Sequence, residues 1–278
     1  MNRRTFSKAI VSLSAIPLMS FKKKPVWSVQ LIRHATLIIK ANYATMLVDP
    51  MLSPKGAMDP VGNAANDTRI PMIDLPMGQE QLAKVLQETD IIFLTHTHRD
   101  HWDPVAQQMI DKSKPIFCQP ADLERIKGQG FMHVTVVEDK IEYNDMTIYR
   151  TGGQHGIGDI GQRMGTVSGY VFELGNDRLY LAGDTIWCVD VEDALKKFKP
   201  QVTVVNAGGA QFLTGGPITM NAEDVKTVAT ANPKGKVVAV HMDTINHCKV
   251  TRQILKKVVA ENNLTNVRIP DDGSTLTF

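Results

Sequence analysis

The chain has 278 residues, of which 43% are hydrophobic, so it can bury a sizeable core and is not expected to be disordered. Its formal net charge is +2, but six of the 31 basic residues lie in residues 1–25, which contain no acidic residue. The rest of the chain carries 25 basic and 29 acidic side chains. Charge therefore gives no reason to expect a nucleic-acid partner, whose phosphates need a basic surface.

Residues 1–25 have the composition of a targeting segment. The stretch Asn2–Lys8, NRRTFSK, precedes a short apolar run at 9–19 and the basic group Lys22–Lys24. This order resembles a twin-arginine export signal, which implies a protein that reaches the periplasm already folded. The alternative is a cytoplasmic protein with a basic N-terminus. Because the apolar run is shorter than the roughly 20 residues of a membrane-spanning helix, no transmembrane anchor is expected.

Residues 26–278 are predicted to form one domain, because no repeat, heptad or low-complexity tract interrupts them. Three strands are expected at 26–33, 35–40 and 44–48, and their close spacing favours antiparallel pairing. The following segment, 49–78, contains five prolines and no periodicity. Such a segment is typical of a lid or a substrate-facing loop, although a passive surface insertion is the alternative.

Helices and strands alternate from residue 79 onward. A helix is expected at 79–88, a buried strand at 90–95, and a helix at 104–111 that begins with Asp103 as N-cap and Pro104 in the first turn. Further strands are expected near 116 and at 134–137, 147–151, 166–174, 178–182, 202–206 and 237–241, with helices at 191–198, 222–231 and 251–262. This order predicts two sheets packed face to face with helices outside.

The stretch Leu94–Asp103, LTHTHRDHWD, holds three of the eight histidines of the chain. His96 and His98 project to the same side of an extended segment, and Asp100 and His101 follow at the turn into the next helix. Imidazole and carboxylate are good ligands for zinc and similar divalent metals. Four such groups from one turn cannot easily surround one ion, so partners elsewhere or a second ion are expected. A hydrogen-bonded surface cluster is the alternative.

Further candidate ligands end other predicted strands: Asp49 in LVDP, His155 in GGQHG, Asp184 in YLAGDT and His241 in VVAVHMDT. The pattern His96-x-His98-x-Asp100-His101, followed by His155, Asp184 and His241, resembles the metallo-β-lactamase superfamily over residues 26–278. The resemblance implies an α+β fold, the four-layered αββα sandwich.

The same resemblance implies two divalent metal ions, either zinc or, with the same donor set, manganese or iron. The implied ligands are His96, His98 and His155 for one ion, Asp100, His101 and His241 for the other, Asp184 as the bridge, and Asp49 as support from behind. The implied activity is hydrolysis, in which the ions lower the pKa of a bridging water and polarise a carbonyl or phosphoryl oxygen. Asp100 and Asp184 would be the catalytic carboxylates, and Asp100 would orient the nucleophile or pass protons.

Three shorter motifs are similar to the branch that includes ascorbate-6-phosphate lactonase-like and N-acyl-phosphatidylethanolamine phospholipase D-like proteins: His34 in IRHATLII, the stretch 59–61, and NHCKVTR at 246–252. This likeness implies a small ester, lactone or phosphodiester substrate, either a small molecule or a lipid-like one. Asp100 disfavours β-lactam hydrolysis, because the commonest zinc β-lactamases have a cysteine ligand in this region. His34 and His247 are candidates for contact with substrate or ligands, and buried structural histidines are the alternative.

Two other functions remain as alternatives. An iron-containing oxidoreductase of the same fold is one, although its flavin-binding partner domain has no counterpart in this length. A non-catalytic metal binder is the other, but no ligand position is lost. Trp102 and Trp187 lie near proposed ligands and could line a pocket or belong to the core. Cys118, Cys188 and Cys248 are too widely spaced for a disulfide framework or a CxxC zinc site, so they are expected to pack as small hydrophobic residues.

Overall fold

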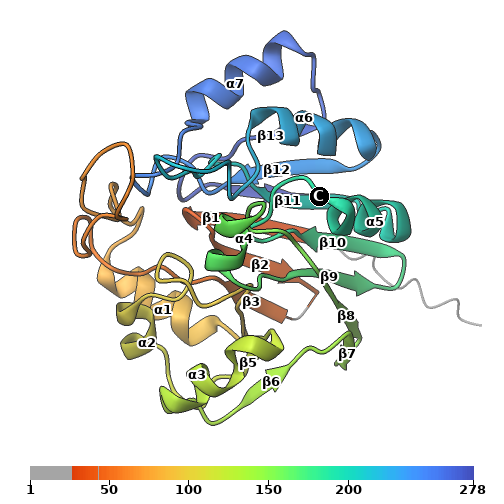
Figure 1. Ribbon diagram of the computed structural model, residues 1–278. Helices are drawn as coiled ribbons and strands as arrows, with labels where there is room; N and C mark the ends of the chain where they lie inside the picture. Colours follow the sequence, from red (N-terminus) through yellow and green to blue (C-terminus); the bar gives the residue numbers. More distant parts are fainter. Residues whose placement is uncertain (1–26, 43) are drawn as a thin grey trace, which may run out of the picture.

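Two mixed β-sheets of seven strands each form the centre of the fold in the computed structural model, which describes residues 27–42 and 44–278 (Figure 1). The first sheet has the order β14 (Thr275–Thr277), β1 (Trp27–Arg33), β2 (Thr36–Ala41), β3 (Ala44–Val48), β4 (Ile91–Phe93), β5 (Ile116–Cys118) and β6 (Val134–Val136). The second has the order β13 (Val267–Arg268), β12 (Lys236–Val240), β11 (Val202–Asn206), β10 (Asp177–Leu181), β9 (Gly169–Leu174), β8 (Met146–Thr151) and β7 (Lys140–Tyr143). The predicted export segment, residues 1–25, lies outside the described residues.

Helices cover the outer face of each sheet, which completes four layers (Figure 1). The first sheet packs against α1 (Gln79–Glu88), α2 (Pro104–Met109) and α3 (Leu123–Gly128), and a 3-10 turn, Pro120–Asp122, precedes α3. The second sheet packs against α5 (Val189–Phe198), α6 (Ala222–Ala231) and α7 (Arg252–Glu261). A further short helix, α4 (Asp159–Met164), lies between β8 and β9 in the chain. The predicted αββα order is confirmed.

The alternation of side chains along the strands explains the layers. In β2, Leu37 and Ile39 point into the core between the sheets, whereas Ile38 points outward and packs in the cluster that contains Leu82 of α1. In β10, Leu179 and Leu181 belong to the inner core, and Tyr180 belongs to the cluster with α5 and α6. Both faces of these strands are covered in the middle, so the central residues 37–39 and 179–181 are apolar without interruption. Each buried side chain of this size contributes about 1.5–3 kcal/mol to folding.

The strand directions bring several strand ends to one edge of the sandwich. Both β1 and β3 pair antiparallel with β2 and therefore run in the same direction, and β3 pairs parallel with β4. In the second sheet, β8 and β10 both pair antiparallel with β9 and therefore run in the same direction. The strand β11 pairs parallel with both β10 and β12, so these three strands also share that direction. The carboxyl ends of β1, β3 and β4 thus share one edge of the first sheet, and those of β8, β10 and β12 share one edge of the second.

Most expected elements are confirmed, including the antiparallel strands β1 to β3 and the helices α1 and α6, whose observed bounds are the predicted ones. The structure adds β7, β13, β14, α3 and α4, which were not predicted. The segment 49–78 contains neither helix nor strand, only an isolated bridge between Met58 and Ile70. None of the helices in the described part of the chain combines the length and the apolar character needed to cross a membrane.

Candidate metal centre

All the proposed ligands lie at the edge where the strand ends meet. His34 follows β1 and Asp49 follows β3, while the stretch from His96 to His101 follows β4. From the second sheet, His155 follows β8, Asp184 follows β10, and His241 directly follows β12. Side chains that are far apart in the sequence therefore meet at one place, held by backbone that the two sheets fix. This is the arrangement that a precise ligand site requires.

The turn after β4 is fixed by its own hydrogen bonds. The backbone N–H groups of His101 and Trp102 donate to the carbonyl oxygen of His98 at 3.0 and 2.8 Å. Asp103 caps α2, because one of its carboxylate oxygens accepts from the Ala106 N–H at 2.7 Å and the other from the Ser53 N–H at 2.6 Å. The predicted N-cap is confirmed. Trp102 is fully buried against Phe131, so it belongs to the core.

Three histidines form the first group of possible ligands: His96, His98 and His155, whose ligand atoms lie within 4.8 Å of one another. The Nδ1–H of His155 donates to the carbonyl oxygen of Ile218 at 2.7 Å, which leaves Nε2 as the atom directed at an ion. Burial lowers the pKa of His155 below its ordinary value, and burial together with the charge of His101 lowers that of His96 well below. Both imidazoles therefore favour the neutral form that binds metal.

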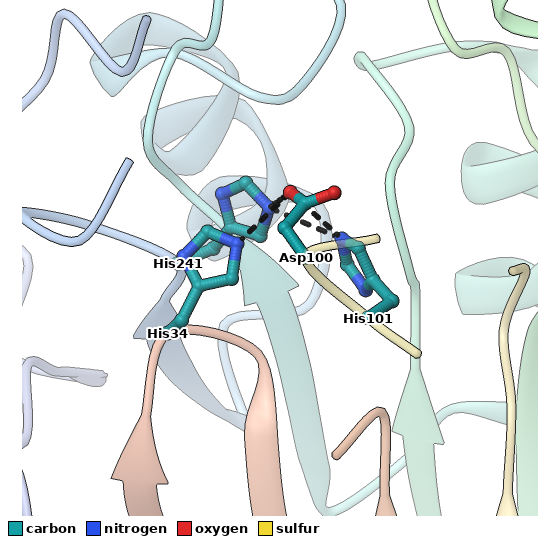
Figure 2. A group of neighbouring side chains, drawn as sticks. All are labelled: His34, Asp100, His101 and His241. Atoms are coloured by element: carbon teal, nitrogen blue, oxygen red, sulfur yellow. Dashed lines mark hydrogen bonds and ion pairs between the residues drawn. The ribbon is translucent and has the colours of Figure 1, made fainter. Parts of the chain in front are cut away.

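The second group comprises His34, Asp100, His101 and His241 (Figure 2). The Asp100 Oδ2 atom lies 3.2 Å from the His34 Nε2, 3.6 Å from the His101 Nε2 and 3.7 Å from the His241 Nε2. Figure 2 shows this carboxylate between the three imidazoles. The ring of His34 also lies against that of His241, with centroids 3.6 Å apart.

His34 thus lies closer to the metal ligands than the sequence indicated. From the sequence His34 was expected only to contact substrate or ligands, whereas in the structure it belongs to a group of four side chains that could hold an ion. It occupies the turn between β1 and β2 with φ of 61°, a left-handed conformation that is uncommon for a non-glycine residue. The signal available in the sequence was a histidine placed between two closely spaced predicted strands, 26–33 and 35–40.

Asp184 lies between the two groups. Its Oδ2 atom is 3.2 Å from the His101 Nε2 and 3.6 Å from the His155 Nε2, and its Oδ1 atom is 3.3 Å from the His241 Nε2. Burial alone would raise the pKa of Asp184, but His101 and His241 outweigh it and hold the pKa well below the ordinary value. One ionised carboxylate therefore reaches residues of both groups, as a bridging ligand must. Asn206, which sequence analysis missed, donates to its Oδ1 at 2.6 Å.

Asp49 supports the site from behind the ligands. Its carboxylate accepts hydrogen bonds from the Thr95 N–H at 2.8 Å, the Thr95 hydroxyl at 2.7 Å and the His101 Nδ1–H at 2.9 Å. Burial raises the pKa of Asp49, and the hydrogen bonds from His101 and Thr95 oppose that rise. The bond to Nδ1 fixes the His101 ring with Nε2 toward Asp100 and Asp184, the orientation that ligation needs.

Substitution Asp49→Asn is expected to weaken metal binding at the second group by about 10- to 100-fold, because His101 loses the carboxylate that orients its ring. Asparagine suits the backbone here, where φ is 43°. The measurement is a titration of metal-free protein with zinc against a chromophoric chelator. Asp90→Asn is the matched control, since Asp90 also accepts a backbone N–H, that of Thr45, at the other end of β4. Equal zinc affinity in both variants would contradict the assigned role.

A cavity of about 230 Å³ opens next to the ligands. Its polar wall contains His98, Asp100, His155 and Asp184, and its other walls contain Val61, Met164, Phe212, Ile218 and His247. Val61 belongs to the segment 49–78, so part of that segment lines the cavity, as the first of its two alternatives, a substrate-facing loop, requires. Arg99 donates to the carbonyl oxygens of Asp59 and Pro60 at 2.9 and 3.0 Å and so holds this segment beside the ligands.

The donor set fits divalent metal ions. Imidazole nitrogens and carboxylate oxygens converge in three overlapping groups, and Asp184 connects them. Such mixed nitrogen and oxygen ligands suit zinc, and they also suit manganese and iron. All seven ligands proposed from the sequence are brought together, with Asp49, His34 and His247 adjacent.

Comparisons with known proteins agree with this architecture. A family model described as a beta-lactamase superfamily domain matches residues 28–241. The UPF0173 protein YddR of Bacillus subtilis (strain 168) is 34% identical over 252 residues, which cover 89% of this chain and 98% of that protein. A possible metal-dependent hydrolase from Veillonella parvula DSM 2008 is 37% identical with a TM-score of 0.87, and isothiocyanate hydrolase from Delia radicum gut bacteria is 37% identical with a TM-score of 0.85. Both structural matches cover 90% of this chain and 99% of the other chain.

Two packed sheets between helices, with a histidine- and aspartate-rich cluster at one edge, define an αββα protein built to hold metal. The chain belongs to the beta-lactamase superfamily, as the family model and the relatives show. The family and fold expected from the sequence are thereby confirmed. Together with the ligand cluster, the relatives support a metal-dependent hydrolase.

Proposed function

We propose that the protein is a hydrolase that works with two divalent metal ions on a small ester, lactone or phosphodiester. The observation that carries this proposal is the position of Asp184, whose two oxygens reach His155 of the first group and His241 of the second, at 3.6 and 3.3 Å. A site for a single ion would not need a second set of ligands joined through one carboxylate.

Two ions held in this way would lower the pKa of a water between them and polarise the substrate oxygen. The side chains of the protein would orient this nucleophile. Asp100 lies on the cavity wall, and its Oδ2 is held by the His34 Nε2 at 3.2 Å. The side chain of Asp100 is 13% exposed, against 4% for Asp184. Asp100 is therefore the carboxylate that the nucleophile can approach, while Asp184 serves as a ligand.

The cavity favours a small substrate with an apolar substituent. Its volume of about 230 Å³ is below the range of roughly 300–1,000 Å³ typical of pockets for drug-sized molecules. Val61, Met164, Phe212 and Ile218 provide apolar walls opposite the ligands. A compact aliphatic or aromatic group fits these walls, whereas the acyl chains of a phospholipid would extend beyond them. A small molecule is thus favoured over the lipid-like alternative.

Isothiocyanate hydrolysis is a second candidate. One solved structure at 37% identity is described as an isothiocyanate hydrolase. An isothiocyanate places an electrophilic carbon between nitrogen and sulfur, next to an organic substituent. The same nucleophile that attacks an ester carbonyl can attack this carbon, and the apolar walls can hold the substituent.

A hydrolysis screen on protein of measured metal content tests the proposal. The substrates are phenyl acetate, a five-membered lactone, bis(para-nitrophenyl) phosphate, benzyl isothiocyanate and phosphatidylethanolamine vesicles. We expect turnover of at least one of the four small compounds, loss of that turnover on chelation, and its return when zinc or manganese is added. No turnover of any of these compounds by protein that holds two equivalents of metal would refute the proposed substrate classes, and full turnover with one equivalent would refute the two-ion mechanism.

A further inference from the structure

His247 is a buried imidazole that lies beside the metal ligands without belonging to them. It follows β12 in the chain and lines the same cavity as Asp100, His155 and Asp184. Only 7% of its surface is exposed. Among the described residues, the groups that could hold an ion do not include it. Its position therefore indicates that it contacts a ligand bound in the cavity.

The Nδ1 atom of His247 is enclosed and has no hydrogen-bond partner among residues 27–42 and 44–278. Buried polar atoms in folded proteins almost always have a partner, so a buried nitrogen without one needs an explanation. Here the ring borders a cavity that is large enough for a small molecule. The enclosed Nδ1 cannot be reached from that cavity, so it is best left as the unprotonated nitrogen, with the N–H on Nε2. Nε2 is not among the enclosed atoms, and it is therefore the nitrogen that a ligand in the cavity can contact.

The ring packs against an aromatic neighbour, and the backbone that carries it is anchored by hydrogen bonds. The aromatic ring of Phe212 lies against it, with centroids 5.4 Å apart and planes inclined by 27°. The carbonyl oxygen of His247 accepts a hydrogen bond from the Gln211 N–H at 2.9 Å. The preceding residue, Asn246, accepts from the Val61 N–H at 2.9 Å and donates to the carbonyl oxygens of Val61 and Asn66 at 3.0 and 2.7 Å. A group fixed in advance is what transition-state stabilisation requires.

Burial also determines the charge of the ring. It lowers the pKa of His247 to about 4, so the imidazole is neutral near pH 7. A neutral imidazole still carries one N–H donor, and it can polarise a substrate by hydrogen bonding without giving up a proton. The ring is therefore suited to electrostatic stabilisation rather than to acid catalysis.

We propose that the His247 imidazole donates a hydrogen bond to the substrate heteroatom that gains negative charge during hydrolysis. That atom is the carbonyl oxygen of an ester or lactone, a phosphoryl oxygen of a phosphodiester, or the nitrogen or sulfur of an isothiocyanate. His247 is then a catalytic residue that touches the substrate and is not a metal ligand. The inference rests on the proposed function, because it names a further residue for the same reaction.

The variants His247→Phe and His247→Gln separate this role from a structural one. Phenylalanine keeps the aromatic contact with Phe212 and removes the N–H donor, whereas glutamine keeps a donor. On the small compound that the wild type hydrolyses best, His247→Phe should lower kcat by about 10²- to 10³-fold and change KM by less than about threefold. His247→Gln should recover at least about tenfold of that loss. Both variants should bind as much metal as the wild type.

A second readout does not depend on turnover. Calorimetry of the metal-loaded protein with inorganic phosphate, which presents anionic oxygens at the cavity, should give an affinity about tenfold weaker for His247→Phe than for the wild type. The affinity of His247→Gln should stay within about threefold of the wild-type value. His133→Phe, at an exposed histidine outside the cavity, is the control and should change neither kcat nor phosphate affinity.

Three outcomes distinguish a catalytic role of His247 from a structural one and from failure of the proposed function. If no small compound is hydrolysed but phosphate affinity depends on residue 247 as stated, the proposed function fails while His247 remains an anion-facing donor. If kcat and phosphate affinity of His247→Phe both stay within threefold of the wild type, the inference is overturned. Loss of bound metal in His247→Phe together with loss of activity would also overturn it, because the residue would then support the ligands.

Discussion

Substitution Asp184→Ala is expected to reduce the metal content of both centres and to lower hydrolysis by about 10³-fold or more, since several kcal/mol of transition-state stabilisation depend on the ions. Among the residues that the structure describes, Asp184 is the one whose carboxylate lies within 4 Å of His96 and His155 on one side and of His101 and His241 on the other. Removing it leaves each group without the anionic ligand that the two groups are proposed to share. It also leaves the Asn206 amide without its acceptor.

Elemental analysis of purified protein, combined with the hydrolysis screen, measures this effect. The matched control is Asp177→Asn, because Asp177 begins the strand β10 whose other end leads to Asp184. The control should keep the metal content and activity of the wild type. Thermal unfolding of the metal-free proteins shows whether Asp184→Ala still folds. A folded Asp184→Ala protein with two equivalents of metal and full activity would remove Asp184 from the site.

The second large effect is expected from removing one ligand from each centre separately. His98 occurs only in the first group of possible ligands and His241 only in the second. His98→Asn and His241→Asn should therefore each retain about one equivalent of metal and lose about 10²- to 10³-fold in kcat. Asparagine is the better replacement at residue 241, whose φ of 68° would strain alanine.

The double variant completes this experiment. If the centres are distinct, His98→Asn with His241→Asn should bind close to no metal, and its activity should fall to that of the metal-free wild type. Isothermal titration with zinc gives the number of sites in each protein. Loss of both ions from either single variant would show one cooperative site, and no loss from either would show that the ions are bound elsewhere.

Local sequence patterns were sufficient to predict most of the fold. The N-cap at Asp103 and the periodicity of α1 and α6 are properties of neighbouring residues, and they were found. The strand β14 was not, because its place beside β1 depends on pairing between Leu276 and Val29 across nearly the whole chain. The short helix α4 was missed because glycines with positive φ, Gly158 and Gly165, flank it and hide the helical pattern.

Some site residues could likewise be predicted from local spacing, whereas others are brought to the site only by the pairing of distant strands. The spacing of His96, His98 and His101 is visible in a few residues, so these candidates could be named from the sequence. The approach of His34 to Asp100 depends on β1 and β4 ending at the same edge of the sheet, which local pattern does not contain. Asn206 was missed for a similar reason. It ends β11, and only the strand order of the sheet places β11 between the two strands that lead to proposed ligands. The ligand roles themselves stay predictions for the experiments above.

The bonds from Asn246 to Val61 and Asn66 have a consequence for how this protein could change over evolutionary time. Under the proposed function, part of the substrate cavity is walled by a long irregular segment that is hydrogen-bonded to the rest of the molecule at a few points. The proposed ligands, in contrast, lie at strand ends that the whole sandwich fixes. Mutations or length changes between residues 57 and 70 can therefore reshape the cavity without rebuilding the metal centre. Under the proposed function, new substrate preferences would then be accessible through small steps that keep the ligands in place.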